Sequence, residues 1–238
     1  MYRLFYTPTW FNGWDIIFEA FIFIIALLIA AYSWRIYKLN KENQFAYLSL
    51  AFILISLGLL VKIGTNATLY FTPIREVALG ALAPVVAGPQ SNLQFADLFY
   101  RAGFFLQMVP ILGAWLLIFF LSQKARKRLT RWYEVSQIAL FIYLILLISV
   151  LANFKYMVFY LTSAVILSLI VLNYYKTYLN KNLNENTYLV MWSFILILFS
   201  NLSFIFVFAW ENFYILGEVF LLIGFLLLLY VYRKVVRN

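Results

Sequence analysis

The sequence contains neither cysteine nor histidine. The absence of cysteine excludes disulfides, thiolate nucleophiles and thiolate metal sites. The absence of histidine excludes imidazole bases, Ser–His relays and histidine zinc sites. Most intramembrane hydrolases and metalloenzymes depend on one of these groups. An enzyme built from this chain would have to work with carboxylates alone, and we expect no metal or other cofactor.

Charged residues are also scarce. They make up 11% of the 238 residues, whereas 66% are hydrophobic and the mean hydropathy is +0.91. A soluble domain is about half apolar and about a quarter charged. This excess of apolar residues cannot be buried in one soluble core, so the composition predicts an integral membrane protein.

One segment, 95–131, fixes the predicted orientation. It begins with isolated charges and continues through enough apolar residues to cross a bilayer, which takes roughly 20. It ends in five cations with no acid until Glu134: Lys124, Arg126, Lys127, Arg128 and Arg131. Because short loops rich in lysine and arginine stay in the cytoplasm, this end of the helix points inward.

The same reasoning along the chain predicts an all-α bundle of seven transmembrane helices in the cell membrane. The amino terminus lies outside and the carboxyl terminus lies in the cytoplasm, so that thirteen of the 18 cations fall on the inner side. We expect one domain, 1–238. The predicted helices cover about 13–37, 44–63, the apolar part of 95–131, 133–152, 157–178, 187–209 and 213–232.

The longest connection, 64–94, is predicted to be an outer loop. It contains Pro73, Pro84 and Pro89, and its apolar stretch 77–88 is too short to span, which is typical of an interfacial or re-entrant segment. Asn66 begins an Asn-Ala-Thr triplet that matches the N-glycosylation acceptor pattern on the predicted outer side.

Seven ionisable residues lie in or near the outer ends of the spans: Asp15, Glu19, Lys62, Asp97, Arg101, Glu211 and Glu218. Asp15 and Glu19 share a helix face. One interpretation is an outward-facing polar pocket, in which an excess of acids would suit a cation, a proton or an amine. The alternative is that Asp15, Lys62 and Asp97 simply face water at the span ends, with Arg101 paired to Asp97 along the helix. We expect Glu218 to pair with Arg101.

The small residues of the last two spans favour packing. Gly217 and Gly224 lie seven apart on one face and predict close helix approach. Pro110 is predicted to kink the third span.

The final predicted span also excludes retinal attachment, because it contains no lysine before Lys234. Two stretches, 44–63 (QFAYLSLAFILISLGLLVKI) and 215–235 (ILGEVFLLIGFLLLLYVYRKV), resemble uncharacterised archaeal seven-helix membrane proteins that are similar to membrane sensor modules. The resemblance implies a sensing or partner-binding bundle. It assigns no site residue.

The leading hypothesis is therefore a sensor or partner-binding scaffold. A small ligand or partner would bind outside, and an anionic lipid or protein would bind the basic loop inside. The alternative is a small-solute or cation transporter, although the sequence shows no convincing internal repeat. Enzymatic activity ranks third, and no catalytic residue is assigned. Nucleic-acid binding is not expected, because the cations lie beside helix ends.

Overall fold

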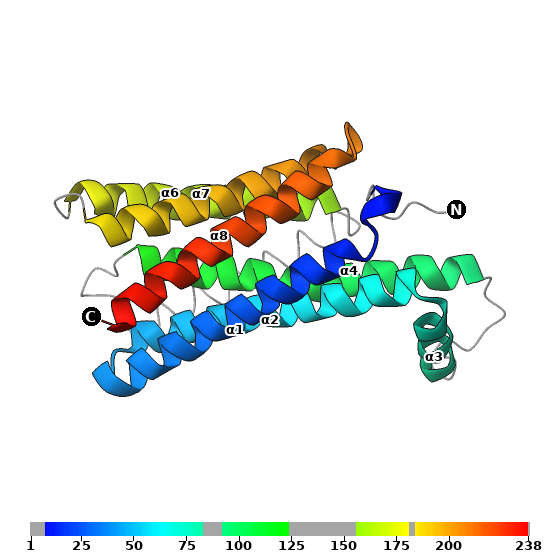
Figure 1. Cartoon of the computed structure of the whole chain (residues 1–238), viewed down its shortest axis with the longest axis horizontal. Helices are drawn as coiled ribbons and strands as arrows, with labels where there is room; N and C mark the ends of the chain where they lie inside the picture. Colours follow the sequence, from blue (N-terminus) through cyan, green and yellow to red (C-terminus); the bar gives the residue numbers. More distant parts are fainter. Residues whose placement is uncertain (1–7, 83–91, 124–155, 181–183, 238) are drawn as a thin grey trace.

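The computed structural model describes residues 8–82, 92–123, 156–180 and 184–237, and over these residues it contains helices and no strands. Figure 1 shows long helices lying side by side. They are α1 (Trp14–Asn40), α2 (Asn43–Tyr70), α4 (Asn92–Ser122), α6 (Tyr156–Asn180), α7 (Glu185–Ile205) and α8 (Asn212–Arg237). Shorter elements are α3 (Thr72–Leu82) and the 3-10 turns η1 (Thr9–Phe11) and η2 (Phe206–Phe208).

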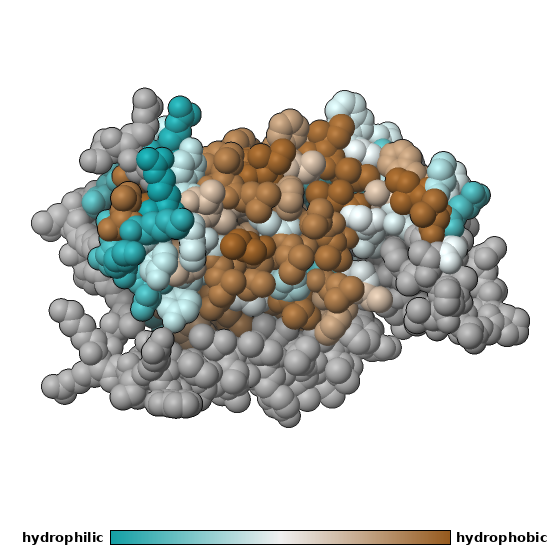
Figure 2. Space-filling model, turned by 90° about the horizontal axis from the view of Figure 1, so that it is seen from below, coloured by the Kyte–Doolittle hydropathy of each residue, from teal (hydrophilic) through white to brown (hydrophobic). Residues whose placement is uncertain are grey.

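Six of these helices are long and apolar enough to cross a membrane, which confirms the all-α prediction and the prediction of a multi-pass membrane protein. Figure 2 shows the corresponding surface, with a broad hydrophobic band and hydrophilic side chains gathered at one end. The predicted span 133–152 lies outside the described residues. The count of seven spans and the orientation of the termini therefore stay predictions.

The six spans pack in a closed ring. Following the contacts, α1 packs on α2, α2 on α4, α4 on α6, α6 on α7, α7 on α8, and α8 returns to α1. Two of these contacts need glycine. A Cβ at Gly58 would lie 2.8 Å from the backbone oxygen of Gln107, and one at Gly224 would lie 3.0 Å from that of Ser193. The close approach predicted for Gly217 and Gly224 is confirmed, since a Cβ at Gly217 would lie 2.7 Å from the Phe204 ring.

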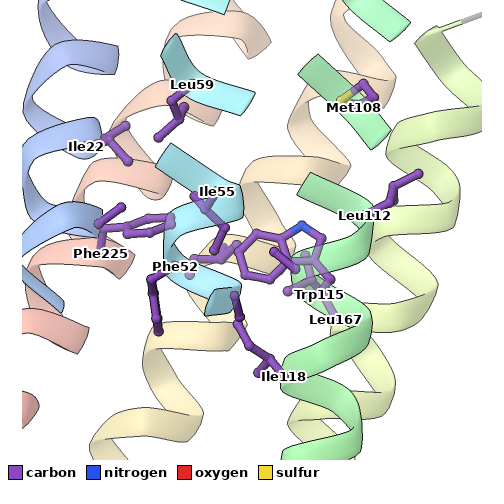
Figure 3. Close-up of a cluster of buried hydrophobic side chains, with 14 of the residues drawn as sticks. Ile22, Phe52, Ile55, Leu59, Met108, Leu112, Trp115, Ile118, Leu167 and Phe225 are labelled. Atoms are coloured by element: carbon purple, nitrogen blue, oxygen red, sulfur yellow. The ribbon is translucent and has the colours of Figure 1, made fainter. Parts of the chain in front are cut away.

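Apolar side chains fill the interior of the ring. Figure 3 shows this core, whose members come from five different spans and are each no more than 3% exposed. They include Ile22 of α1, Phe52, Ile55 and Leu59 of α2, Met108, Leu112 and Trp115 of α4, Leu167 of α6, and Phe225 of α8. Because lipid tails are as apolar as these side chains, close van der Waals packing between the spans stabilises this core.

The predicted end of the second span at residue 63 is wrong, because α2 continues to Tyr70. The Thr65 and Thr68 hydroxyls donate to the Val61 and Gly64 carbonyls within the helix, at 2.8 Å each. These threonines are therefore satisfied within the helix, in a segment that was predicted to be a loop.

The predicted outer loop 64–94 is also partly helical, since α3 follows α2 directly. Figure 1 shows α3 running across the direction of the spans at the end where α2 finishes. Its Ile74 and Val77 side chains are 45% and 73% exposed. This is consistent with the interfacial segment predicted over 77–88, of which residues 83–88 lie outside the described part.

Candidate functional site

Five polar side chains meet inside the ring, and we call them the Lys62 cluster. Its members are at most 3% exposed: Asp15 and Glu19 of α1, Lys62 and Asn66 of α2, and Glu218 of α8. On each of α1 and α2 the two residues are four apart, so they lie on one face of their helix. The cluster lies near the end of the bundle where α1 and α8 begin and α2 finishes, which we call the cluster end.

Lys62 is the centre of this cluster. Its Nζ lies 2.8 Å from Glu19 Oε1 and 2.7 Å from Glu218 Oε1, so one ammonium joins α1, α2 and α8. The lysine side chain is 4% exposed and both carboxylates are fully buried. Because desolvated charges are strongly destabilising without a partner, these two ion pairs are required for the three groups to be buried while charged.

Two aromatic rings complete the surroundings of the ammonium. Lys62 Nζ lies 5.4 Å from the centroid of the Phe204 ring and 5.6 Å from that of Tyr214. The rings also contact each other, with centroids 5.5 Å apart. A cation at this distance is attracted by the electron-rich ring faces. Lys62 thus occupies a site made of two carboxylates and two aromatic rings.

Asp15 has a different role in the cluster. Its Oδ1 accepts hydrogen bonds from the backbone N–H groups of Gly13 and Ile16, at 2.9 and 3.0 Å. Its Oδ2 accepts from the Tyr70 hydroxyl at 2.7 Å and from Asn66 Nδ2 at 3.3 Å. Asp15 is therefore satisfied without a cation, and it ties the start of α1 to the end of α2. Its position in the first helical turn also suits the helix dipole.

Asn66 links the two acids of α1. Its Nδ2 donates to Glu19 Oε1 at 3.1 Å as well as to Asp15. The glycosylation interpretation of Asn66 is wrong in this structure, because the side chain is 2% exposed and its amide is engaged in these bonds. Asn66 was not among the predicted site residues, because the second span was expected to end before it.

The amino-terminal turn covers the cluster. Phe11 of η1 is 4% exposed, and its ring centroid lies 5.8 Å from Phe18 and 6.2 Å from Tyr214, the ring that faces Lys62. Gly13, at the junction with α1, has φ +94°, a left-handed conformation that favours glycine. The backbone turns there, which places Phe11 over the start of α8.

The cluster has more acid than base. Its three carboxylates face one ammonium, and Glu218 Oε2 is buried and accepts no hydrogen bond in the part of the chain that the structure describes. Tyr214 lies one turn earlier on α8, four residues before Glu218 and so on the same face of the helix. The cluster therefore keeps one acceptor for a further donor.

The structure thus brings together some of the predicted site residues. Asp15, Glu19, Lys62 and Glu218 come together, and the alternative that Asp15 and Lys62 face water is wrong because both are buried. Glu218 pairs with Lys62 where we expected Arg101. Asp97 and Arg101 belong to α4, but their side chains lie outside the described part, as does the whole basic loop of Lys124, Arg126, Lys127, Arg128 and Arg131.

The chemistry available to the cluster is cation or proton binding at carboxylates. Over the described ranges, no three acidic side chains are arranged to hold a metal ion. Comparison with known proteins gives no further guidance, because no family model, no curated protein and no solved structure matches this chain.

Proposed function

We propose that this multi-pass membrane protein is a sensor in the cell membrane, and that the Lys62 cluster is the element that responds to a cation, an amine or a proton. The observation that carries the proposal is the burial of three carboxylates and one lysine within apolar spans, with the lysine paired to two of the carboxylates. Ionisable groups inside spans are energetically unfavourable, and where they occur they mark functional sites or paired structural charges.

The interior of the bundle favours sensing over transport. Moving from the cluster toward the other end, Glu19 is followed by Ile22, and Lys62 is preceded along α2 by Leu59, Ile55 and Phe52, all buried. Along α1 and α2 the buried side chains beyond the cluster are therefore mostly apolar, with Ser33, Ser49 and Ser56 as the polar exceptions. Binding at the cluster would instead change how α1, α2 and α8 are held together.

The charge distribution supports the predicted orientation, with the cluster end outside. The exposed cations of the described residues lie toward the opposite end: Arg35, Lys38 and Lys41 on or after α1, Lys176 on α6, and Arg233 on α8. An excess of exposed lysine and arginine at one end of the spans is typical of the cytoplasmic side of a membrane protein. It would also attract anionic lipid headgroups or an acidic protein partner, together with the predicted basic loop.

A small-solute or cation transporter is the second candidate. In its favour, carboxylates within spans are common on cation and proton pathways. Against it, transporter sites are typically formed by broken helices near the membrane midplane. Here α4 is continuous through Pro110, and α8 is continuous through Glu218.

The test is the thermal stability of the purified protein against a panel of inorganic cations, amines and pH values. A ligand that binds only the folded state raises the melting temperature by mass action. We expect a stabilising cation for the wild type that fails to stabilise Glu19→Gln and Glu218→Gln. Glu185→Gln is the matched control, because Glu185 is 72% exposed and pairs with Lys234 away from the cluster.

Two outcomes would decide against this function. If no cation, amine or proton shifts the wild-type melting temperature, the cluster is a structural ion-pair network. If a stabilising cation is found and accumulates in proteoliposomes through the wild type but not through Glu218→Gln, the protein is a transporter.

A further inference from the structure

The surroundings of Lys62 Nζ match the requirements of a primary ammonium group. Such a group donates up to three hydrogen bonds. Here the Glu218 carboxylate accepts one at 2.7 Å, and Glu19 Oε1 forms an ion pair with the same nitrogen at 2.8 Å. The Phe204 and Tyr214 rings lie against the same nitrogen. Aromatic faces combined with carboxylates are a recognised environment for organic cations, because they provide attraction without the oxygen cage that a hydrated metal ion needs.

We propose that this position is an exchangeable binding site for the primary ammonium group of a small external amine, and that Lys62 is its resident occupant. The proposal rests on the sensor function and names its ligand class. An incoming alkylammonium would make the same contacts to Glu19, Glu218 and the two rings. The displaced lysine would move its ammonium toward the cluster end along its flexible stem.

The acid excess makes such an exchange electrostatically feasible. Asp15 is already satisfied by four donors, so Glu19 and Glu218 remain as the two carboxylates that need a cation. Glu218 Oε2 accepts no hydrogen bond among the described residues, and it is available to a second ammonium while Lys62 still contacts Oε1. The two ammonium groups could therefore share the carboxylates during exchange, without leaving either acid unpaired.

The covering turn gives the exchange an access point. Phe11 packs on Tyr214, which in turn contacts the Lys62 ammonium, so the aromatic wall of the site is in contact with η1. Displacing this three-residue turn would remove the Phe11 ring from the apolar core and uncover Tyr214. Gly13, with its positive φ, is the junction about which η1 would move.

The experiment uses Lys62→Ala in the full chain. Relative to lysine, alanine lacks Cγ, Cδ, Cε and the ammonium, and these atoms together correspond to n-propylammonium. We expect n-propylammonium to raise the melting temperature of Lys62→Ala in a saturable manner. Tetramethylammonium, which has no N–H donor, should act much more weakly, as should sodium.

The triple variant Lys62→Ala/Glu19→Gln/Glu218→Gln is the control, because it keeps the cavity and removes the carboxylates. It should show no saturable response to n-propylammonium. If Lys62→Ala does not fold alone, the readout becomes the yield of monodisperse protein when n-propylammonium is present during solubilisation, again compared with tetramethylammonium.

Equal responses to n-propylammonium and tetramethylammonium, or an equal response in the triple variant, would overturn the proposal. So would a wild type stabilised through Glu218 by sodium or protons but by no primary amine. The last of these results would contradict the amine site but not the sensor function. A wild type whose melting temperature is unchanged by every cation would contradict both the amine site and the sensor function.

Discussion

Replacing Lys62 with methionine tests the central contact of the structure. The substitution keeps an unbranched side chain of similar length but removes the ammonium that lies 2.7 and 2.8 Å from two buried carboxylates. Breaking a buried ion pair by deleting one partner destabilises a protein by about 3–5 kcal/mol, because the remaining charge is left desolvated. Here two acids lose the same partner, so we expect Lys62→Met to fall at the upper end of that range.

The compensating variant is Lys62→Met/Glu19→Gln/Glu218→Gln. Replacing every member of a buried ion network by neutral groups of similar size is often neutral or stabilising. We therefore expect the triple variant to recover most of the stability that the single variant loses. This recovery separates an electrostatic effect from a simple packing defect, which the two added substitutions would not repair.

The assay is denaturant unfolding in mixed micelles, followed by tryptophan fluorescence. Lys234→Met is the matched control, since Lys234 forms a 2.9 Å pair with Glu185 at the surface, where both partners reach solvent. Exposed pairs contribute little to stability. The structure would be refuted at this point if Lys62→Met were no more destabilising than Lys234→Met, or if the triple variant were less stable than the single one.

Three further predictions concern packing, access and the membrane surface. Gly58→Ala should destabilise the protein by about 1–3 kcal/mol, because the added Cβ would lie 2.8 Å from the Gln107 backbone oxygen. The control is Gly64→Ala on the same helix, whose Cβ would meet nothing within 4 Å and which should be neutral or stabilising by up to about 1 kcal/mol. Chemical denaturation of both variants measures the difference in their free energies of unfolding. Phe11→Ala should uncover Tyr214 and speed amide hydrogen exchange at the start of α8 without changing exchange in the core around Phe52, and unchanged exchange at α8 would contradict the covering role of η1. A fluorophore attached at Val77→Cys should be quenched by lipids labelled near the headgroups and not by a water-soluble quencher, because α3 presents apolar side chains at the cluster end.

Much of the fold could be predicted from the sequence, because apolar length alone identifies a span. The predicted boundaries of the spans 157–178 and 213–232 agree with those of α6 and α8 to within a few residues. The predicted end of the second span was wrong, because the composition of Gly64, Thr65 and Asn66 is typical of a loop. Within the helix the Thr65 hydroxyl is satisfied by the Val61 carbonyl, and Asn66 bonds to the acids of α1. The Asn66 bonds are tertiary contacts that no local pattern reveals.

The candidate site was predictable in its acids and its lysine but not in its pairing. Ionisable residues within spans are conspicuous, so Glu19, Lys62 and Glu218 could be nominated directly. Which cation reaches Glu218 depends on the order of helices around the ring. Because α2 and α8 both pack against α1, Lys62 of α2 reaches Glu218 of α8. Phe204 and Tyr214 could not be singled out, because 21% of the chain is aromatic.

The most direct test of the account is infrared difference spectroscopy of the protein in liposomes, recorded as a primary amine or proton concentration is changed outside. A cation-responsive Lys62 cluster predicts changes in the carboxylate bands that disappear in both Glu19→Gln and Glu218→Gln and persist in Glu185→Gln. Carboxylate bands that do not respond, or that respond equally in Glu218→Gln and the wild type, would contradict the assignment of this cluster as the sensing element.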